Sequence, residues 1–144
     1  GPSFREMIRR QAESNAIPIE FHREMHCQTC RRSHLAQLYR IAQEAVANAL
    51  KHARAGRIEV SLVCPAGQGT VLVVRDDGCG RAGAKASAGG LGLGLMAHRA
   101  RLIGGELRIL DVPGGGTEVV CTAPCPDDAS GPGDCGAPQS RRPA

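Results

Sequence analysis

The chain has 144 residues, a net charge of +4 and a hydrophobic content of 42%, which together predict one compact domain with some tail. Its longest apolar runs, such as residues 71–74, are far too short to cross a membrane, and no signal-peptide pattern appears, so we expect a cytoplasmic domain. Aromatic residues make up only 2% of the chain and the basic residues are scattered, which argues against a nucleic-acid-binding surface.

Seven cysteines are an odd and high number for a chain with no other secretory feature, so a disulfide framework is not expected. Cys27 and Cys30 form a CxxC motif flanked by His26 and His34, which are residue types that bind zinc or iron. No second CxxC motif completes such a site. Free thiols are therefore the preferred interpretation, with a metal or redox sensor in this segment as the alternative.

Helical spacing, strand alternation and turn residues predict the elements in chain order. They are a helix over 4–16, an edge strand over 17–21, an irregular segment over 22–33, a long helix over 33–53, strands over 57–63 and 70–75, a glycine-rich loop over 78–92, a helix over 93–103, and strands over 106–111 and 117–122. This order predicts an α+β fold, a two-layer sandwich of a mixed, mostly antiparallel sheet with helices on one face.

Three segments are expected along the chain. Residues 1–16 are expected to be a tag remnant, suggested by Gly1-Pro2-Ser3, followed by the end of a preceding helix. Residues 17–124 form the predicted domain. Residues 125–144 are rich in Gly, Pro, Ser and Asp without periodicity, which predicts a disordered tail.

The long helix has a polar stripe beside its apolar one. Glu44, Asn48, Lys51 and His52 follow at i, i+4, i+7 and i+8, so they share one face. Most such stripes are only solvated surface, but Asn is a poor helix former in a helix interior. Its amide oxygen suits a hard cation such as Mg²⁺, and a glutamate one turn earlier could orient or deprotonate a hydroxyl group.

Two glycine-containing motifs follow. Asp76-Asp77-Gly78-Cys79-Gly80 comes directly after an apolar strand, where a carboxylate could accept a hydrogen bond from an exocyclic amine and the glycines would let a flat ligand approach the backbone. An ordinary Asp-Gly turn is the simpler interpretation. The run Gly90-Leu91-Gly92-Leu93-Gly94-Leu95 leads into a helix, where free N–H groups favour phosphates. It is neither a Rossmann motif nor a P-loop.

The order and spacing of these motifs resemble the GHKL (Bergerat-fold, HATPase_c) ATPases, which include DNA gyrase, mismatch-repair and heat-shock ATPases and histidine kinases. The segments 38–45 (LYRIAQEA) and 48–53 (NALKHA) resemble the N-box of two-component histidine kinases that pair with LuxR/NarL-like response regulators. The match continues through Gly92-Leu93-Gly94-Leu95-Met96, Arg99, residues 104–107 and Gly116-Thr117, and it spans roughly residues 17–124.

The resemblance implies a role for each matching residue in a site for ATP and Mg²⁺. Asn48 would coordinate the Mg²⁺ that bridges the phosphates, and Glu44 would be the catalytic base or positioning group near the γ-phosphate. Asp76 would bind the adenine amino group. The remaining nucleotide-binding residues implied are Lys51, His52, Gly78, Gly80, Gly90, Gly92, Leu93, Gly94 and Thr117.

The family implies a protein-histidine kinase that binds Mg·ATP and donates the γ-phosphate to a histidine on a separate dimerisation domain. His26 in Arg23-Glu24-Met25-His26 superficially resembles that acceptor, but only 17 residues separate it from Glu44, too few for a helical hairpin. We therefore expect a monomeric fragment that does not phosphorylate itself, from a homodimeric bacterial parent that could be anchored in a membrane.

The expected partners are that dimerisation domain and a LuxR/NarL-like response regulator, with no nucleic acid. A non-catalytic nucleotide-binding regulatory module of the same superfamily is the alternative function. An anti-sigma-type serine kinase is a close relative, but Gln43-Glu44 and Lys51-His52 fit the sequence motif of histidine kinases better.

Overall fold

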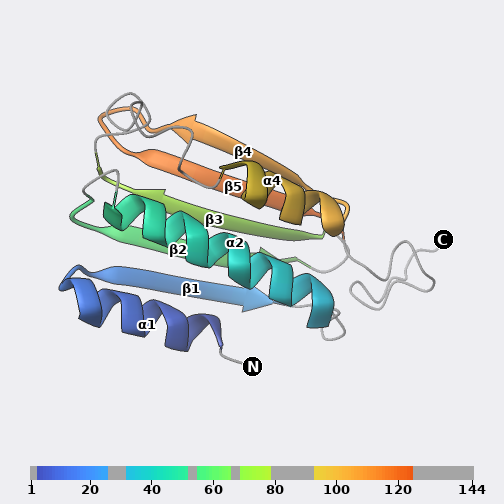
Figure 1. Ribbon diagram of the computed structural model, residues 1–144, viewed down its shortest axis with the longest axis horizontal. Helices are drawn as coiled ribbons and strands as arrows, with labels where there is room; N and C mark the ends of the chain where they lie inside the picture. Colours follow the sequence, from blue (N-terminus) through green and yellow to red (C-terminus); the bar gives the residue numbers. More distant parts are fainter. Residues whose placement is uncertain (1–2, 26–31, 52–54, 66–68, 79–92, 125–144) are drawn as a thin grey trace.

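The computed structural model describes residues 3–25, 32–51, 55–65, 69–78 and 93–124. Its elements in chain order are α1 (Phe4–Asn15), β1 (Ile19–Met25), α2 (Arg32–Lys51), β2 (Ile58–Cys64), β3 (Thr70–Asp76), α4 (Leu93–Leu102), β4 (Glu106–Asp111) and β5 (Thr117–Ala123). Figure 1 shows α1, α2 and α4 lying on one face of the sheet. No helix among the described residues is both long enough and apolar enough to cross a membrane.

The five strands form one mixed sheet in the order β1-β2-β3-β5-β4. β1 pairs with β2 in parallel, while the other three pairs are antiparallel. A parallel pair needs a long crossover connection, and α2 lies in the segment that joins β1 to β2. The predicted two-layer α+β sandwich is confirmed.

The core lies between the helices and the inner face of the sheet. Along β2 and β3 every second residue is buried, as strand pleating requires when one face is covered. The apolar stripe of α2 is confirmed, because Leu38, Ile41, Ala42, Ala45, Val46 and Ala49 are all buried.

The few aromatic residues lie together where α1, β1 and α2 meet. The ring of Phe4 stacks on Phe21 with centroids 6.1 Å apart and meets Tyr39 edge-on at 5.6 Å. Such aromatic pairs contribute about 0.5–1.5 kcal/mol each beyond their burial. Met7 and Ile8 are buried in the same core, so α1 packs into the domain although the predicted domain boundary, which stays a prediction, lies after it.

The edge strand β1 is longer than predicted. The sequence predicted a strand over 17–21 followed by an irregular segment, whereas β1 continues to Met25 in register with Cys64 of β2. Its residues His22, Arg23 and Glu24 are exposed, so this part of the strand has no apolar alternation to read. Backbone pairing with β2 extends it, since a ladder of N–H and C=O groups does not depend on side-chain polarity, and Met25 at its end packs against the core.

Candidate functional site

Asp76 is the last residue of β3, and it is a buried carboxylate with an exposed fraction of 8%. Strand alternation places it on the same face as Leu72 and Val74, which is the face that the helices cover. The sequence places a carboxylate where the pattern would otherwise put an apolar residue, and burying an ionised group needs compensating partners.

Two backbone groups bind the Asp76 carboxylate. The N–H of Gly78 donates to its Oδ1 at 2.8 Å, and the backbone N–H of Thr117 also donates to it. Thr117 is the register partner of Asp76 across the β3–β5 pair. Burial nevertheless raises the pKa of Asp76 above its ordinary value of 3.8, with Asp77 adding to the rise and the two N–H groups opposing it. A further hydrogen-bond donor to this carboxylate would therefore stabilise its ionised form.

Asp77 has a different role from its neighbour. Its exposed side chain accepts hydrogen bonds at Oδ1 from the backbone N–H groups of Gly56 at 2.8 Å and Arg57 at 3.0 Å. These residues follow α2, so Asp77 fixes the end of the α2–β2 connection to the end of β3. Sequence reasoning assigned no role to Asp77, and only the acidic pair directly before Gly78 marked the position.

Gly116 packs directly against the backbone of Asp76 and Asp77. Its φ is +108°, which side-chain-bearing residues rarely adopt, and an added Cβ would overlap the carbonyl oxygen of Asp76 and lie 3.1 Å from the Cα of Asp77. The next turn residue, Gly115, approaches the carbonyl oxygen of Gly78. The β4–β5 turn therefore holds the Asp76–Gly78 segment by close backbone approach, which the sequence indicated only through its run of glycines.

The polar stripe of α2 lies at the same end of the sheet. In Figure 1 the C-terminal end of α2 lies beside the ends of β3 and β5 that carry Asp76 and Thr117. Glu44 and Asn48 are half-buried and Lys51 is exposed. Glu44 and Asn48 therefore lie in the C-terminal half of α2, the half that ends nearer to Asp76.

The start of α4 is the remaining described part of the predicted site. Leu93 is its first residue and is half-buried, whereas Gly94 is exposed with no atom within 4 Å of an added Cβ. His52, Gly80, Gly90 and Gly92 lie outside the described residues, as do His26, Cys27 and Cys30. Within the described ranges, no group of three or more His, Cys, Asp or Glu residues could hold a metal ion.

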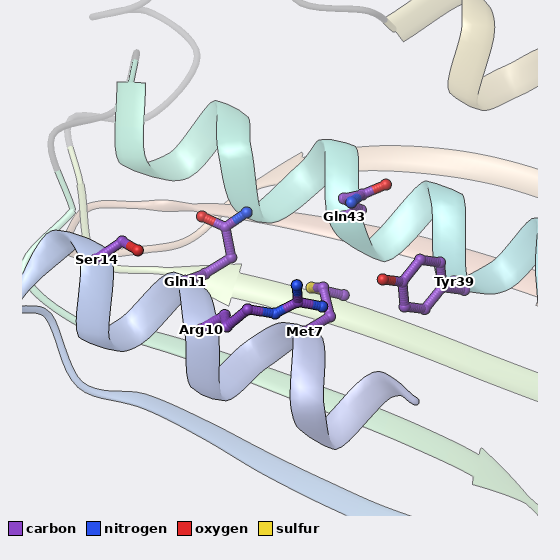
Figure 2. A pocket seen from close by; sticks show the side chains of 6 residues that line it. All are labelled: Met7, Arg10, Gln11, Ser14, Tyr39 and Gln43. Atoms are coloured by element: carbon purple, nitrogen blue, oxygen red, sulfur yellow. The ribbon is translucent and has the colours of Figure 1, made fainter. Parts of the chain in front are cut away.

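A separate groove of about 240 Å³ lies between α1 and α2. Figure 2 shows its lining residues, which are Met7, Arg10, Gln11 and Ser14 from α1 and Tyr39 and Gln43 from α2. None of the predicted nucleotide-binding residues lines it. The candidate site is therefore the end of the sheet around Asp76, not this groove.

The sequence and the fold both match known ATPases and kinases. Residues 34–127 match the family described as "Histidine kinase-, DNA gyrase B-, and HSP90-like ATPase". The nitrate/nitrite sensor protein NarQ of Escherichia coli is 46% identical over 57% of this chain. That alignment covers 14% of NarQ, so the chain spans only a small part of the length of this relative.

Two solved structures show the same fold. A blue-light activated histidine kinase of Erythrobacter litoralis superposes with a TM-score of 0.70 over 86% of this chain and 41% of that chain, at 20% identity. The ATP binding domain of PrrB from Mycobacterium tuberculosis gives 0.60 over 83% of this chain and 91% of that one, at 26% identity. The predicted Bergerat fold is confirmed. The chain therefore belongs to the histidine kinase-, DNA gyrase B-, and HSP90-like ATPase family, as an ATP-binding domain of the sensor histidine kinase type.

Proposed function

We propose that this domain binds Mg·ATP at the end of the sheet around Asp76 and donates the γ-phosphate to a histidine on a dimerisation domain of its parent kinase. The buried Asp76 carboxylate is the observation that carries the proposal. Its pKa is raised by burial even though two backbone N–H groups bind it, so an additional donor would stabilise its ionised form. The exocyclic amino group of adenine is such a donor.

Small residues surround the proposed position of the adenine ring. Gly78 binds Asp76 through its N–H, and Gly116 has no side chain between the two segments. Thr117, the register partner of Asp76, would offer its hydroxyl group beside the same ring. A flat base could therefore approach the backbone of this region without meeting a Cβ at Gly78.

The half-buried residues of α2 would act at the phosphate end. The amide oxygen of Asn48 suits Mg²⁺, a cation that prefers oxygen ligands and would neutralise charge on the phosphates. Glu44 lies one helical turn earlier and is half-buried, so it would accept a proton from the incoming imidazole or hold that ring in line. Lys51 is exposed on the same helix and would contribute positive charge. Phosphoryl transfer depends mainly on such positioning and charge neutralisation.

The proposal also includes the partners of the parent protein. NarQ is a nitrate/nitrite sensor protein that this chain matches over only a part of its length, so the phosphoacceptor domain and a LuxR/NarL-like response regulator are proposed as partners. Phosphate transfer in trans to the parent's dimerisation domain, followed with γ-labelled ATP, tests this step. Nucleotide binding without any transfer would instead support a non-catalytic regulatory module.

Calorimetry with Mg·ADP tests the site itself. Asp76→Asn should abolish detectable binding. The amide would either turn its NH₂ donor toward the adenine amino group, or turn it toward a backbone N–H and lose one of the two backbone bonds. Asn48→Asp should weaken binding severely. Glu106→Gln is the matched control, since Glu106 is an exposed carboxylate at the start of β4. Unchanged affinity in both site variants would refute the assignment, and an equal loss in the control would remove its specificity.

A further inference from the structure

A side-chain hydrogen bond joins α4 to α2 at a distance from the proposed nucleotide site. Arg99 Nη1 donates to Gln37 Oε1 at 3.1 Å, and both side chains are half-buried. The buried residues of α4 are Met96 and Ala100, which contribute only apolar packing. Apolar contacts have no directional preference, whereas a hydrogen bond weakens steeply when its geometry is changed. The Arg99–Gln37 bond therefore adds a directional contact to the apolar packing between α4 and α2.

Gln37 lies on the same face of α2 as the proposed phosphate-end residues. Glu44 and Asn48 follow it by seven and eleven residues, which are whole numbers of helical turns to a close approximation. In Figure 1 α4 runs antiparallel to α2. Leu93 precedes Arg99 by six residues, about 9 Å of helix, and Glu44 follows Gln37 by about 10.5 Å. The bond at Gln37 thus places the first turn of α4 alongside Glu44.

We propose that Arg99 and Gln37 form a positioning pair that sets the location of the first turn of α4 relative to Glu44 and Asn48, and thereby the affinity for nucleotide phosphates. Arg99 does not contact the nucleotide in this arrangement, because it lies about two turns away from Leu93. The favourable field of a helix N-terminus falls off within one turn, so a small displacement of α4 changes what the phosphates meet. The inference rests on the proposed nucleotide site.

The pair is tested in the full chain with the variants Gln37→Met, Arg99→Met and Gln37→Glu. The methionine variants keep much of the side-chain volume and remove the bond, whereas glutamate keeps the acceptor and makes the bond charge-assisted. Arg101→Met is the matched control, because Arg101 is an exposed arginine on the same helix. Calorimetry gives the Kd for Mg·ADP and for AMP, and thermal melting gives the Tm of each variant.

Each methionine variant should weaken Mg·ADP binding by roughly fivefold and AMP binding by less than about twofold, in the usual range for coupling through a packed element. The double methionine variant should be no weaker than either single one. Gln37→Glu and Arg101→Met should bind Mg·ADP like the wild type. Preferential loss for ADP is a signature that a general loss of stability would not produce.

Three results would overturn the proposal. They are an unchanged Kd with a lowered Tm in the methionine variants, an equal loss for AMP and ADP, or a loss in Arg101→Met as large as in Arg99→Met. If a methionine variant fails to fold, Arg99→Lys replaces it in the same comparison of the ADP and AMP affinities. The lysine side chain keeps the positive charge but is shorter than arginine. A wild-type chain that binds no Mg·ADP overturns the proposed function together with this inference, whereas wild-type binding with unchanged variants overturns the inference alone.

Discussion

Replacing Gly116 with alanine should displace Asp76 and so weaken nucleotide binding as well as stability. The backbone at Gly116 has a φ of +108°, a conformation that costs a side-chain-bearing residue about 1–3 kcal/mol. The new Cβ would also lie 3.0 Å from the carbonyl carbon of Asp76 and 3.1 Å from the Cα of Asp77. Since these are backbone atoms, the overlap forces a main-chain shift that adds about 1–3 kcal/mol.

Gly114 in the same turn provides the matched control. Its φ is +91°, but no atom lies within 4 Å of an added Cβ. Gly114→Ala therefore carries the conformational cost of about 1–3 kcal/mol without the overlap. The difference between the two variants isolates the close approach of the β4–β5 turn to Asp76.

Urea unfolding and calorimetry with Mg·ADP measure the two effects separately. Gly116→Ala should lower the free energy of unfolding by about 3 kcal/mol or more and weaken ADP binding roughly tenfold, the loss expected when a hydrogen bond to a charged group is distorted. Gly114→Ala should leave the ADP affinity at the wild-type value. Equal destabilisation by both substitutions, with unchanged ADP affinity in Gly116→Ala, would refute the argument.

Three further outcomes are expected. Asp77→Ala should lower the free energy of unfolding in urea by about 1–2 kcal/mol, because the N–H groups of Gly56 and Arg57 lose their acceptor, while Asp77→Asn should recover part of it; equal losses would contradict this. In ¹³C NMR titrations the Asp76 carboxyl should show a pKa above 3.8 in the free domain and a lower pKa with ADP bound. The affinity for ADP should therefore fall as the pH falls through the free-state pKa. A pKa that rises on ADP binding would contradict the adenine contact. Burial raises the pKa of Cys121 to about 11, so iodoacetamide at neutral pH should label it only after unfolding, as read by peptide mass mapping.

Hydrophobic periodicity predicted the covered elements of this fold well. The apolar stripe of α2 and the alternation of β2 and β3 follow from burial on one face, so they are visible in the sequence. The C-terminal half of β1 was not predicted, because His22 to Glu24 are exposed on an edge strand. The position of β2, a tertiary feature, explains why the chain stays extended there.

The candidate site was predictable as a set of motifs, but not as an arrangement. The sequence indicated Asp76 and Thr117 as residues 41 positions apart in an ordered pattern, and the β3–β5 register brings them together. The role of Asp77 in holding the α2–β2 connection was not predictable, because it depends on where that connection lies. The same holds for the Arg99–Gln37 bond, which joins residues 62 positions apart without a local signature.

The two adjacent carboxylates differ in how their surroundings compensate their charge. Asp77 is exposed, and two backbone N–H groups at 2.8 and 3.0 Å satisfy one of its oxygens, so it holds the fold without a burial cost. Asp76 also binds two backbone N–H groups, yet burial still raises its pKa. A fold selected for stability alone would place an apolar residue at this inward position of β3. We therefore propose that a ligand donates to the buried carboxylate, and that its desolvation is compensated in the bound state.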